Sequence, residues 1–299
     1  MKRKLIIGTR GSKMALAQTG LVADALRAQY PDVTIETKVI TTKGDKNMAP
    51  IPLDSVGKDW FTKEIEVALA AGEIDFAVHS FKDLAPVQPE GLIVQPVFKR
   101  SDPRDVLVSG RQELQLQDLP EGAVIGTDSL RRKANLLIQR PDLVVRSLRG
   151  NVQTRLQKLA DEDYDAIVLA AAGLERLNEL DRVSEYFEPD AFVPAIGQGV
   201  LAVETRIADT ELRDMIETLQ DEPTLQAVAA EQKFSAVIGG GCKLPVGCYA
   251  ELNGDTVTIH GMLGSDDATQ AVIRSTSGAV ADAVRLAEEL AATLQRELK

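Results

Sequence analysis

The sequence predicts a mixed α/β fold: two lobes followed by a small α+β domain. Most of the chain alternates short apolar runs with amphipathic helical segments, the pattern of βα units that build a mixed sheet. Connections rich in proline, glycine or charge interrupt this rhythm at residues 99–104 and 193–199. The tail instead runs strand, turn, strand, turn, strand, helix. At 299 residues, 44% of them hydrophobic, the chain is long enough for two or three packed domains.

The first lobe is predicted to start with a buried strand at residues 4–8. A turn with the sequence Thr-Arg-Gly-Ser leads from it into a helix from Lys13 to Gln29, and Pro31 ends that helix. Residues 41–58 are polar and contain glycines and prolines, so they are predicted to form a long loop of the kind that often has a function. The other elements expected in this lobe are strands at 33–40, 76–79 and 92–97 and a helix at 62–71.

The second lobe repeats the βα rhythm between the two interruptions. Helices are expected to start near Ser129 and Asn151. Because the chain crosses between lobes twice, we expect a cleft between them, with hinges near 99–104 and 193–199. Strands are expected at 106–109, 124–126, 143–147 and 166–169. The domain boundaries predicted in this way are 1–98 plus about 200–219 for the first lobe, 99–199 for the second and 220–299 for the C-terminal domain.

The tail is predicted to be a small α+β domain. Asn253-Gly254 is a strong hairpin signal between two strands. The final helix over 280–299 is amphipathic, and its apolar stripe is more typical of packing on a sheet than of a coiled coil. The strands are expected at 246–252, 256–263 and 270–276, and the stripe contains Val280, Val284, Ala287, Ala291, Leu294 and Leu298.

Composition excludes several classes of function. The formal net charge of -11 argues against general binding of nucleic acid, which needs a broad basic surface. No run of apolar residues is long enough to span a bilayer, and the N-terminus leads directly into a strand, so the cytoplasm is the expected location. Two cysteines six residues apart exclude a disulfide scaffold and match no zinc motif. The two histidines, His79 and His260, are expected to be structural, and no metal site is predicted.

A basic cluster stands out against this acidic background. The planar guanidinium group of arginine binds a carboxylate or phosphate through two parallel hydrogen bonds, which lysine cannot reproduce. Any one of these arginines is more often a solvated surface charge, but the group as a whole predicts a ligand with several acidic arms. The cluster consists of Arg131, Arg132, Lys133, Arg140, Arg146, Arg149 and Arg155.

Two further residues could carry chemistry. Cys242 follows three glycines and precedes Lys243, so its sulfur could be exposed and partly ionised. The alternative is a small buried cysteine in a glycine loop, and Cys248, within an apolar strand pattern, is expected to be a packing residue. Asp83 comes just after a predicted strand, where side chains often face a binding cleft, so it is a candidate acid or base. The alternative for Asp83 is a loop carboxylate that forms a salt bridge beside Lys82.

Seven segments, in order over nearly the whole chain, resemble those of the porphobilinogen deaminases, also called hydroxymethylbilane synthases. Each segment is weak alone, but together they are specific. No nucleotide-binding motif is present. The segments are Gly8-Thr-Arg-Gly-Ser12 with Ala15-x-Ala-Gln18, Phe61-Thr-Lys-Glu-Ile, Ala77-Val-His-Ser-Phe-Lys-Asp83, Gly126-Thr-Asp-Ser-Leu-Arg-Arg132, Leu148-Arg-Gly-Asn-Val-Gln-Thr-Arg155, Pro194-Ala-Ile-Gly-Gln-Gly199 and Gly241-Cys-Lys-Leu-Pro245.

The resemblance implies a transferase of tetrapyrrole and haem biosynthesis. Such enzymes join four porphobilinogen molecules head to tail into hydroxymethylbilane and release ammonia at each step. Their fold is implied to be two lobes like type II periplasmic binding proteins, plus a C-terminal domain that carries the cysteine loop. Each pyrrole bears an acetate and a propionate, which gives the arginine cluster a ligand. The enzyme is further expected to be a monomer without membrane or nucleic-acid partners.

The resemblance also assigns roles to residues. Asp83 matches the catalytic carboxylate, and Cys242 matches the cysteine that carries a covalent dipyrromethane cofactor through a thioether. Lys58 falls in the predicted long loop and is assigned to the site as well. The residues implied to hold cofactor carboxylates are Lys82, Thr127, Ser129, Arg131, Arg132 and Arg155. Those implied to serve the substrate or growing chain are Arg10, Ser12, Gln18, Arg149, Asn151, Arg176 and Gln198, some of which could serve both roles.

Two departures from the family pattern bear on the function. Residues 56–61 are less rich in glycine than in relatives and contain the single tryptophan of the chain. Asp128 replaces a usual serine, and we expect it to pair with Arg131 or Arg132 and weaken their hold on a carboxylate. Two alternatives remain. Because the two-lobed fold is shared with solute receptors, one is a non-catalytic binding protein for a polycarboxylate. The other is a relative that keeps the fold and cofactor but has lost turnover through the changes in the loop.

Overall fold

The structure, a computed structural model, describes residues 4–46, 62–110, 114–239 and 244–298. The chain divides into two compact units, Met1–Arg100 with Val200–Leu225, and Ser101–Gly199 with Gln226–Lys299. Each unit therefore consists of two separate stretches of the chain, and each is described by itself. None of the helices in the described ranges has the length and hydrophobicity needed to cross a bilayer.

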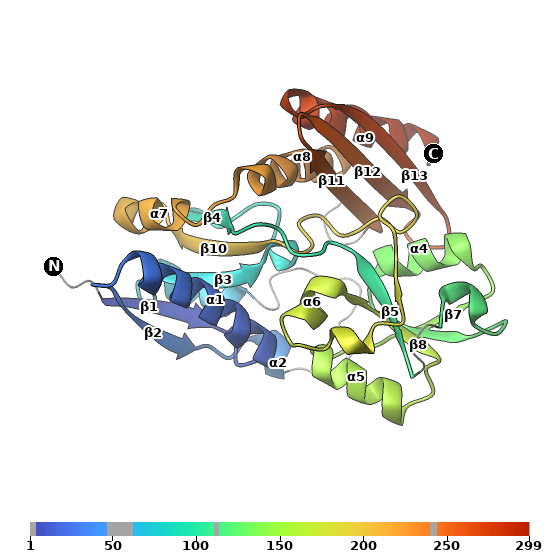
Figure 1. Ribbon diagram of the computed structural model, residues 1–299, viewed down its shortest axis with the longest axis horizontal. Helices are drawn as coiled ribbons and strands as arrows, with labels where there is room; N and C mark the ends of the chain where they lie inside the picture. Colours follow the sequence, from blue (N-terminus) through green and yellow to red (C-terminus); the bar gives the residue numbers. More distant parts are fainter. Residues whose placement is uncertain (1–3, 47–61, 111–113, 240–243, 299) are drawn as a thin grey trace. The chain divides into compact units, whose positions relative to one another are not determined.

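The first unit is built on a five-stranded mixed sheet in the order β2-β1-β3-β10-β4 (Figure 1). Strand β1 pairs in parallel with β2 and β3, whereas β10 runs antiparallel to β3 and β4. Because β10 comes from the second stretch of the unit, the sheet is complete only after the chain has returned to it. The strands are β1 (Lys4–Thr9), β2 (Thr34–Val39), β3 (Phe76–Ser80), β4 (Leu92–Val97) and β10 (Leu201–Arg206).

Helices cover both faces of this sheet. Val22 and Leu26 of α1 pack with Leu5 and Ile7 of β1 in the larger core. Ile65 of α3 belongs to a second core cluster. The predicted boundaries of α1 are confirmed, while part of the predicted long loop forms the short helix α2. The helices are α1 (Lys13–Gln29), α2 (Lys43–Lys46), α3 (Lys63–Ala70) and α7 (Thr210–Glu217), and a single 3₁₀ turn covers Phe81–Asp83.

The second unit contains a sheet with the equivalent strand order, β7-β6-β8-β5-β9. Strand β6 runs parallel to β7 and β8, and β5 runs antiparallel to β8 and β9. The α/β class predicted for both lobes is therefore confirmed. The strands are β5 (Asp105–Ser109), β6 (Val124–Gly126), β7 (Val144–Arg146), β8 (Ala166–Ala170) and β9 (Glu185–Tyr186), and the helices are α4 (Leu130–Gln139), α5 (Val152–Asp161) and α6 (Ala171–Glu175).

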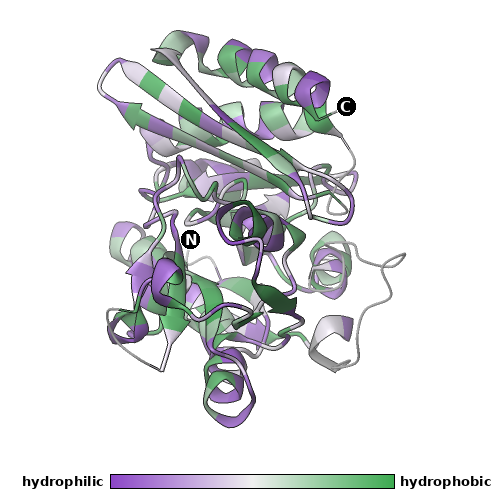
Figure 2. Ribbon diagram, turned by 90° about the vertical axis from the view of Figure 1, so that its right-hand side faces the viewer, coloured by the Kyte–Doolittle hydropathy of each residue, from purple (hydrophilic) through white to green (hydrophobic). Residues whose placement is uncertain are grey.

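The C-terminal part of this unit is the predicted α+β arrangement. Its antiparallel sheet β11-β12-β13 packs on α8 and α9, and hydrophilic and hydrophobic residues alternate along these elements in Figure 2. Cys248 is fully buried in β11, as predicted. The expected apolar stripe of α9 was wrong at Val284, which is 44% exposed. The elements are α8 (Glu222–Ile238), β11 (Val246–Asn253), β12 (Thr256–Gly264), β13 (Ala271–Ala279) and α9 (Ala283–Glu297).

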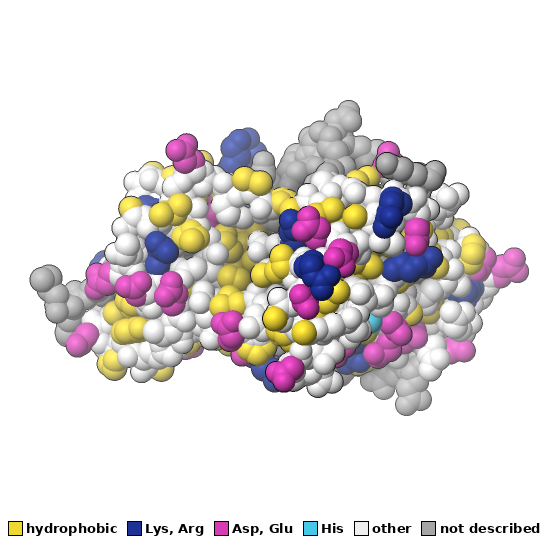
Figure 3. Space-filling model, turned by 90° about the horizontal axis from the view of Figure 1, so that it is seen from above, with side chains coloured by type: hydrophobic (Ala, Val, Ile, Leu, Met, Phe, Trp, Pro, Cys, Tyr) yellow, Lys and Arg dark blue, Asp and Glu magenta, His cyan; other side chains and the backbone are white. Residues whose placement is uncertain are grey.

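The exposed side chains of α9 include ion-paired residues as well as Val284. Arg285 pairs with Asp282 at 3.3 Å and with Glu289 at 2.7 Å. Acidic and basic side chains are interspersed on the face of the molecule in Figure 3. Such exposed pairs contribute less than about 1 kcal/mol each, so the stability of this part comes mainly from its buried core.

The segment before residue 200 packs closely against the C-terminal sheet. The N–H of Cys248 donates to the carbonyl oxygen of Pro194 at 3.1 Å. A Cβ atom on Gly247 would lie 2.9 Å from the carbonyl oxygens of Val193 and Pro194, so only glycine allows this approach. Gly197 and Gly199 have φ angles of 66° and 89°, in the left-handed region that favours glycine. These turns lie in the segment for which the sequence predicts a hinge.

Candidate active site

The predicted site residues divide between the two units. Arg10, Ser12, Gln18, Lys82 and Asp83 lie in the first unit. Two of the predicted residues, Cys242 and Lys58, lie outside the described residues. The remaining nine lie in the second unit: Thr127, Ser129, Arg131, Arg132, Arg149, Asn151, Arg155, Arg176 and Gln198.

In the first unit, two neighbouring parallel strands bring the predicted residues together. Ser12 is the N-cap of α1, and its hydroxyl accepts a hydrogen bond from the N–H of Ala15 at 3.2 Å. Gln18, buried one turn further along, donates through Nε2 to Ser80 Oγ at 2.8 Å. This bond links the start of α1 to the end of β3.

Asp83 lies at the end of the 3₁₀ turn that follows β3. The turn is fixed by its neighbours, because the side chains of Phe81 and Leu84 are buried and the N–H of Phe81 donates to the carbonyl oxygen of Val200 at 3.0 Å. Asp83 itself is exposed and makes no hydrogen bond or ion pair with any described residue. The alternative of a salt-bridged loop carboxylate therefore finds no support among the described residues.

In the second unit, α4 and α5 both start at predicted ligand residues. Ser129 caps α4 and accepts from the N–H of Arg132 at 3.3 Å. Asn151 caps α5 and accepts from the N–H of Thr154 at 2.9 Å. Each cap follows a strand of the parallel part of the sheet, and the N-terminus of a helix favours an anion. The hydroxyl oxygen of Thr127 accepts from the N–H of Ser129 at 3.1 Å and tightens the turn before α4.

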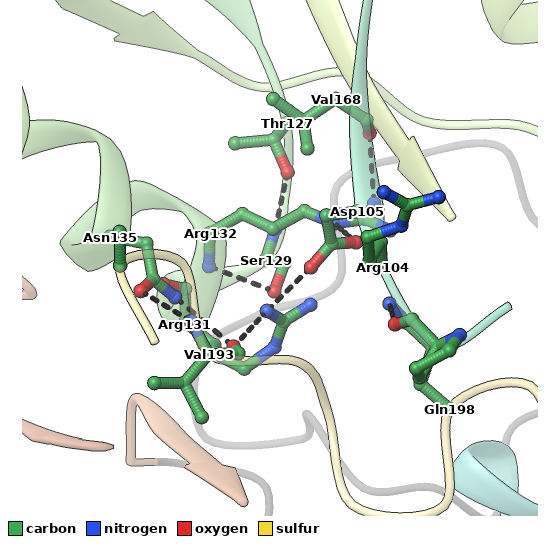
Figure 4. A network of polar contacts seen from close by, with 12 residues as sticks. Arg104, Asp105, Thr127, Ser129, Arg131, Arg132, Asn135, Val168, Val193 and Gln198 are labelled. Carbon is green, nitrogen blue, oxygen red and sulfur yellow. Dashed lines mark hydrogen bonds and ion pairs between the residues drawn. The ribbon is translucent and has the colours of Figure 1, made fainter. Parts of the chain in front are cut away.

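Arg131 and Arg132 share one buried carboxylate, that of Asp105 (Figure 4). Arg131 Nη1 donates to Asp105 Oδ2 at 2.7 Å and to the carbonyl oxygen of Val193 at 2.6 Å. Arg132 donates to Asp105 Oδ1 through Nε at 3.0 Å and Nη2 at 2.8 Å, and through Nη1 to the carbonyl oxygen of Val168 at 2.9 Å. The strand β5 thus supplies the counter-ion for two residues at the start of α4.

This buried group has one positive charge in excess, because two guanidinium groups share a single carboxylate. Burial, together with the neighbouring charge of Arg132, lowers the pKa of Arg131, although Asp105 opposes the shift. An unbalanced buried charge is costly unless an anion approaches it. Nε and Nη2 of Arg131 make no hydrogen bond to a described residue. The donor set and the charge therefore fit a ligand carboxylate.

The sequence led us to expect that Asp128 pairs with Arg131 or Arg132. In the structure it pairs with Arg149 instead. Its Oδ2 lies 3.1 Å from Arg149 Nε, and its Oδ1 accepts a hydrogen bond from Ser147 Oγ. The expected pairing was wrong because Asp105 already occupies the arginine pair from within the sheet. A ligand carboxylate that approached Arg149 would therefore compete with Asp128, whereas one that approached the buried pair would not.

We expect the Asp128→Ser variant to bind a carboxylate substrate more tightly. Both partners of the Asp128–Arg149 pair are partly solvated, so the competition is worth less than about 1 kcal/mol and the KM for such a substrate should fall by about two- to fivefold. Steady-state kinetics at low and high salt measure this, and the difference should shrink as salt screens the pair. Asp142→Ser, which removes the partner of Arg140 instead, is the matched control; an unchanged or higher KM in Asp128→Ser contradicts the prediction.

Other members of the basic cluster have structural partners. Arg140 binds Asp142 at 2.7 Å and carbonyl oxygens that include that of Leu116 at 2.8 Å. The Arg146 guanidinium lies 4.1 Å from the centre of the Tyr164 ring. Lys133 donates to the carbonyl oxygen of Asp267 at 2.9 Å. The remaining members of the predicted cluster are Arg131, Arg132, Arg149 and Arg155, of which Arg155 donates through Nε to the carbonyl oxygen of Gly150 at 2.8 Å.

Arg176, at the end of α6, and Gln198 both contact the segments where the second unit begins and its first stretch ends. Arg176 Nη2 donates to the carbonyl oxygen of Gly199 at 2.8 Å, and the N–H of Ser101 donates to the same carbonyl at 3.3 Å. Gln198 is fully buried and donates through Nε2 to the carbonyl oxygen of Pro103 at 2.7 Å. In the described contacts, both side chains hold these two segments together.

Comparison with known proteins decides the family. The profile of the porphobilinogen deaminase dipyromethane cofactor binding domain matches residues 5–214, and that of the porphobilinogen deaminase C-terminal domain matches residues 225–298. The chain belongs to the porphobilinogen deaminase family. Among its relatives, the porphobilinogen deaminase of Roseiflexus sp. (strain RS-1) is 49% identical over 89% of this chain and 88% of its own length, and that of Geobacillus kaustophilus is 49% identical over 94% and 91%.

Solved structures with low similarity include two periplasmic proteins. A Salmonella typhimurium periplasmic binding protein specific for arginine is 12% identical with a TM-score of 0.44, and it covers 75% of this chain and 94% of that one. The periplasmic VFT2 domain of Bordetella pertussis BvgS is 15% identical with a TM-score of 0.45, over 73% and 86%.

Asp105, the shared partner of two predicted site residues, is a residue that the sequence analysis did not single out. It is fully buried, although it directly follows the charged connection at residues 99–104. The signal that could have identified it is a carboxylate at the first position of a strand whose next three residues are apolar. A buried carboxylate requires a partner, and in this chain the arginine pair is that partner.

Proposed function

We propose that this chain catalyses the stepwise condensation of porphobilinogen to hydroxymethylbilane with the residues described above. One observation carries the assignment: a protein with a net charge of -11 buries two arginines on one carboxylate and leaves one guanidinium edge without a described partner. A ligand rich in carboxylates supplies the missing negative charge. Porphobilinogen and its oligomers carry two carboxylates on every ring.

Each condensation exchanges one bond for another. The bond from the aminomethyl carbon to nitrogen breaks, and ammonia leaves with its electron pair. The same carbon then bonds to the free α-carbon of the preceding pyrrole, which loses a proton. Positive charge develops on the ring as ammonia departs, and we assign the exposed carboxylate of Asp83 to offset it and to transfer the protons.

The dipyrromethane cofactor has a matching set of residues in the chain. When bound, it supplies the free α-carbon to which the first substrate ring is joined. Cys242 is the proposed point of attachment. Arg131 offers the unengaged Nε and Nη2 donors, while Arg132 contributes charge next to it. The residues proposed to hold the cofactor carboxylates are Lys82, Thr127, Ser129, Arg131, Arg132 and Arg155.

The substrate and the growing chain need binding groups that position each ring without fixing it. Arg149 suits this, because Asp128 shares it and a ligand carboxylate can exchange with that partner. Binding energy that is the same in the ground state and in the transition state would not accelerate the reaction. The residues proposed for this role are Arg10, Ser12, Gln18, Lys58, Arg149, Asn151, Arg176 and Gln198.

We also propose that the chain has three domains: 1–98 plus about 200–219, 99–199, and 220–299. The main core cluster of the last domain contains no residue of the sheet in residues 105–186, which supports treating it as a domain of its own, while a small cluster of Ala134, Val193, Met262 and Ala268 joins the two regions. We expect the enzyme to act as a cytoplasmic monomer that needs neither nucleic acid nor membrane. Light scattering of the purified protein tests the monomer.

Intact mass tests the enzyme assignment. We expect the purified wild-type protein to be heavier than its sequence by two porphobilinogen units less two ammonias, and the Cys242→Ser variant to lack this addition. If the wild type is unmodified, incubation with porphobilinogen should create the adduct. A wild type that gains no mass even then would favour the alternative, a binding protein for polycarboxylates, which has no use for Cys242.

A separate experiment distinguishes an active enzyme from an inactive relative. A protein that carries the adduct but forms no hydroxymethylbilane from added porphobilinogen would have kept the cofactor and lost turnover. We expect formation of the linear tetrapyrrole, which can be followed by its cyclisation to a coloured porphyrin after oxidation.

A further inference from the structure

Asp105 is a fully buried carboxylate that takes no part in the proposed reaction steps. It is the first residue of β5 and pairs with Ala170 of β8 in the antiparallel register. Its own carbonyl oxygen accepts the N–H of Phe187 at 3.0 Å. The backbone of Asp105 is therefore fixed from both sides of the strand, and its side chain projects to the arginine pair from a rigid position.

The carboxylate engages the two arginines in different ways. Arg132 turns its Nε–Nη2 edge toward Asp105, and both nitrogens donate to the single oxygen Oδ1. Its third nitrogen is occupied by the carbonyl oxygen of Val168. Arg131 uses only Nη1 and keeps its Nε–Nη2 edge without a hydrogen bond to a described residue. This edge is the one that binds a carboxylate through two parallel bonds.

A second acceptor fixes the orientation of Arg131. The carbonyl oxygen of Val193 accepts from Arg131 Nη1 at 2.6 Å, and Asn135 holds Val193 in place. The N–H of Val193 donates to Asn135 Oδ1 at 3.0 Å, and Asn135 Nδ2 donates to the carbonyl oxygens of Arg131 at 3.0 Å and Val193 at 3.3 Å. With both hydrogens of Nη1 held by buried acceptors, the guanidinium plane cannot turn freely.

We propose that Asp105 is a positioning residue: it retains Arg132 as an internal counter-ion and turns Arg131 so that its Nε–Nη2 edge meets a ligand carboxylate. The inference rests on the proposed function and deepens it. The sequence assigned the binding of a ligand carboxylate to both arginines, whereas the structure gives each arginine a different part in it. Arg131 makes the bidentate contact with the ligand. Arg132 acts on the ligand through its charge and through Asp105.

The test compares the Asp105→Asn variant with the wild type in formation of the covalent adduct. Unprimed protein is incubated with increasing concentrations of porphobilinogen, and the adduct is followed by intact mass. We expect the half-saturating concentration to rise about 10- to 100-fold, the range expected for losing a charge-assisted bidentate contact. The rate at saturation should change much less, because no reacting group has been altered.

The matched control is Asp102→Asn, which makes the same change to a partly exposed carboxylate that pairs with Arg104. It should stay within about twofold of the wild type, as expected for a surface ion pair. A folded Asp105→Asn protein with the half-saturating concentration of the wild type would overturn the proposal. If Asp105→Asn does not fold, Asp105→Glu keeps the charge and displaces it by one methylene, and the same rise is required of it.

Chemical labelling tests the orientation without using the reaction. In Cys242→Ser protein, which carries no adduct, phenylglyoxal should modify Arg131 faster than Arg132, and peptide mass mapping separates the two sites. In the additional Asp105→Asn variant this preference should disappear. Equal labelling in the presence of Asp105 would contradict the proposed orientation. Failure of the wild type to form any adduct would count against the proposed function alone, since the labelling would still report on Asp105.

Discussion

The Asp83→Asn variant is expected to lose turnover by about 100- to 10,000-fold, the usual contribution of general acid–base catalysis. Asparagine has the same shape but neither the negative charge nor the ability to accept a proton. The side chain of Asp83 is exposed and makes no hydrogen bond or ion pair with any described residue, so its replacement should leave the fold unchanged. Single-turnover and steady-state assays with porphobilinogen measure the loss, and urea unfolding checks the stability.

Asp32→Asn provides the control for Asp83→Asn, because it makes the same change at another exposed carboxylate of the first unit, beyond the end of α1. It should have wild-type turnover and an unchanged unfolding midpoint. Near-normal turnover in Asp83→Asn would remove this residue from the mechanism. A large loss of stability would instead mean that the lost activity does not report on chemistry.

The elements that the sequence predicted well are those with a strong local signal. The helix α1 runs from Lys13 to Gln29 as expected, because Ser12 caps its start and Pro31 prevents its extension. The strands β1, β3 and β8 are short apolar runs between polar turns. In these segments, periodicity and turn residues indicate the same structure as the tertiary contacts do.

Elements with charged buried residues were harder to predict. No strand was expected at 201–206, although β10 completes the first sheet. Its sequence includes Glu204, which is fully buried and whose Oε2 lies 3.2 Å from His79 Nε2 on the neighbouring strand. That contact joins residues far apart in the sequence, so no local pattern reveals it. Helices α6, α7 and α8 were not predicted either.

The candidate site shows the same contrast between what local sequence predicts and what depends on distant contacts. The sequence predicts that Arg131 and Arg132 bind an anion, but it could not show that one buried carboxylate holds both, since Asp105 precedes them by 26 and 27 residues. Nor could it place Asp128 against Arg149. Residue type predicts what a side chain can bind, whereas the choice among nearby partners depends on the sheet that brings them together.

The Glu231→Leu variant is expected to lose about 3 kcal/mol of unfolding free energy. Glu231 is fully buried in α8, and its two oxygens accept the N–H groups of Gly197 at 2.7 Å and Ala250 at 2.9 Å. Leucine fills similar space but leaves both donors buried without these acceptors, at a cost of about 1–3 kcal/mol each. Urea denaturation monitored by circular dichroism measures the change.

Two comparisons separate this effect from a general intolerance of leucine or of lost charge. Glu217→Leu, at an exposed position in α7, should change the unfolding free energy by no more than about 0.5 kcal/mol. Glu231→Gln keeps one acceptor oxygen and should fall between the wild type and Glu231→Leu. Gly197 belongs to the segment that also contains Val193, whose carbonyl oxygen accepts from Arg131, so Glu231→Leu should additionally slow adduct formation. Equal unfolding free energies of Glu231→Leu and Glu217→Leu would show that Glu231 does not anchor this segment.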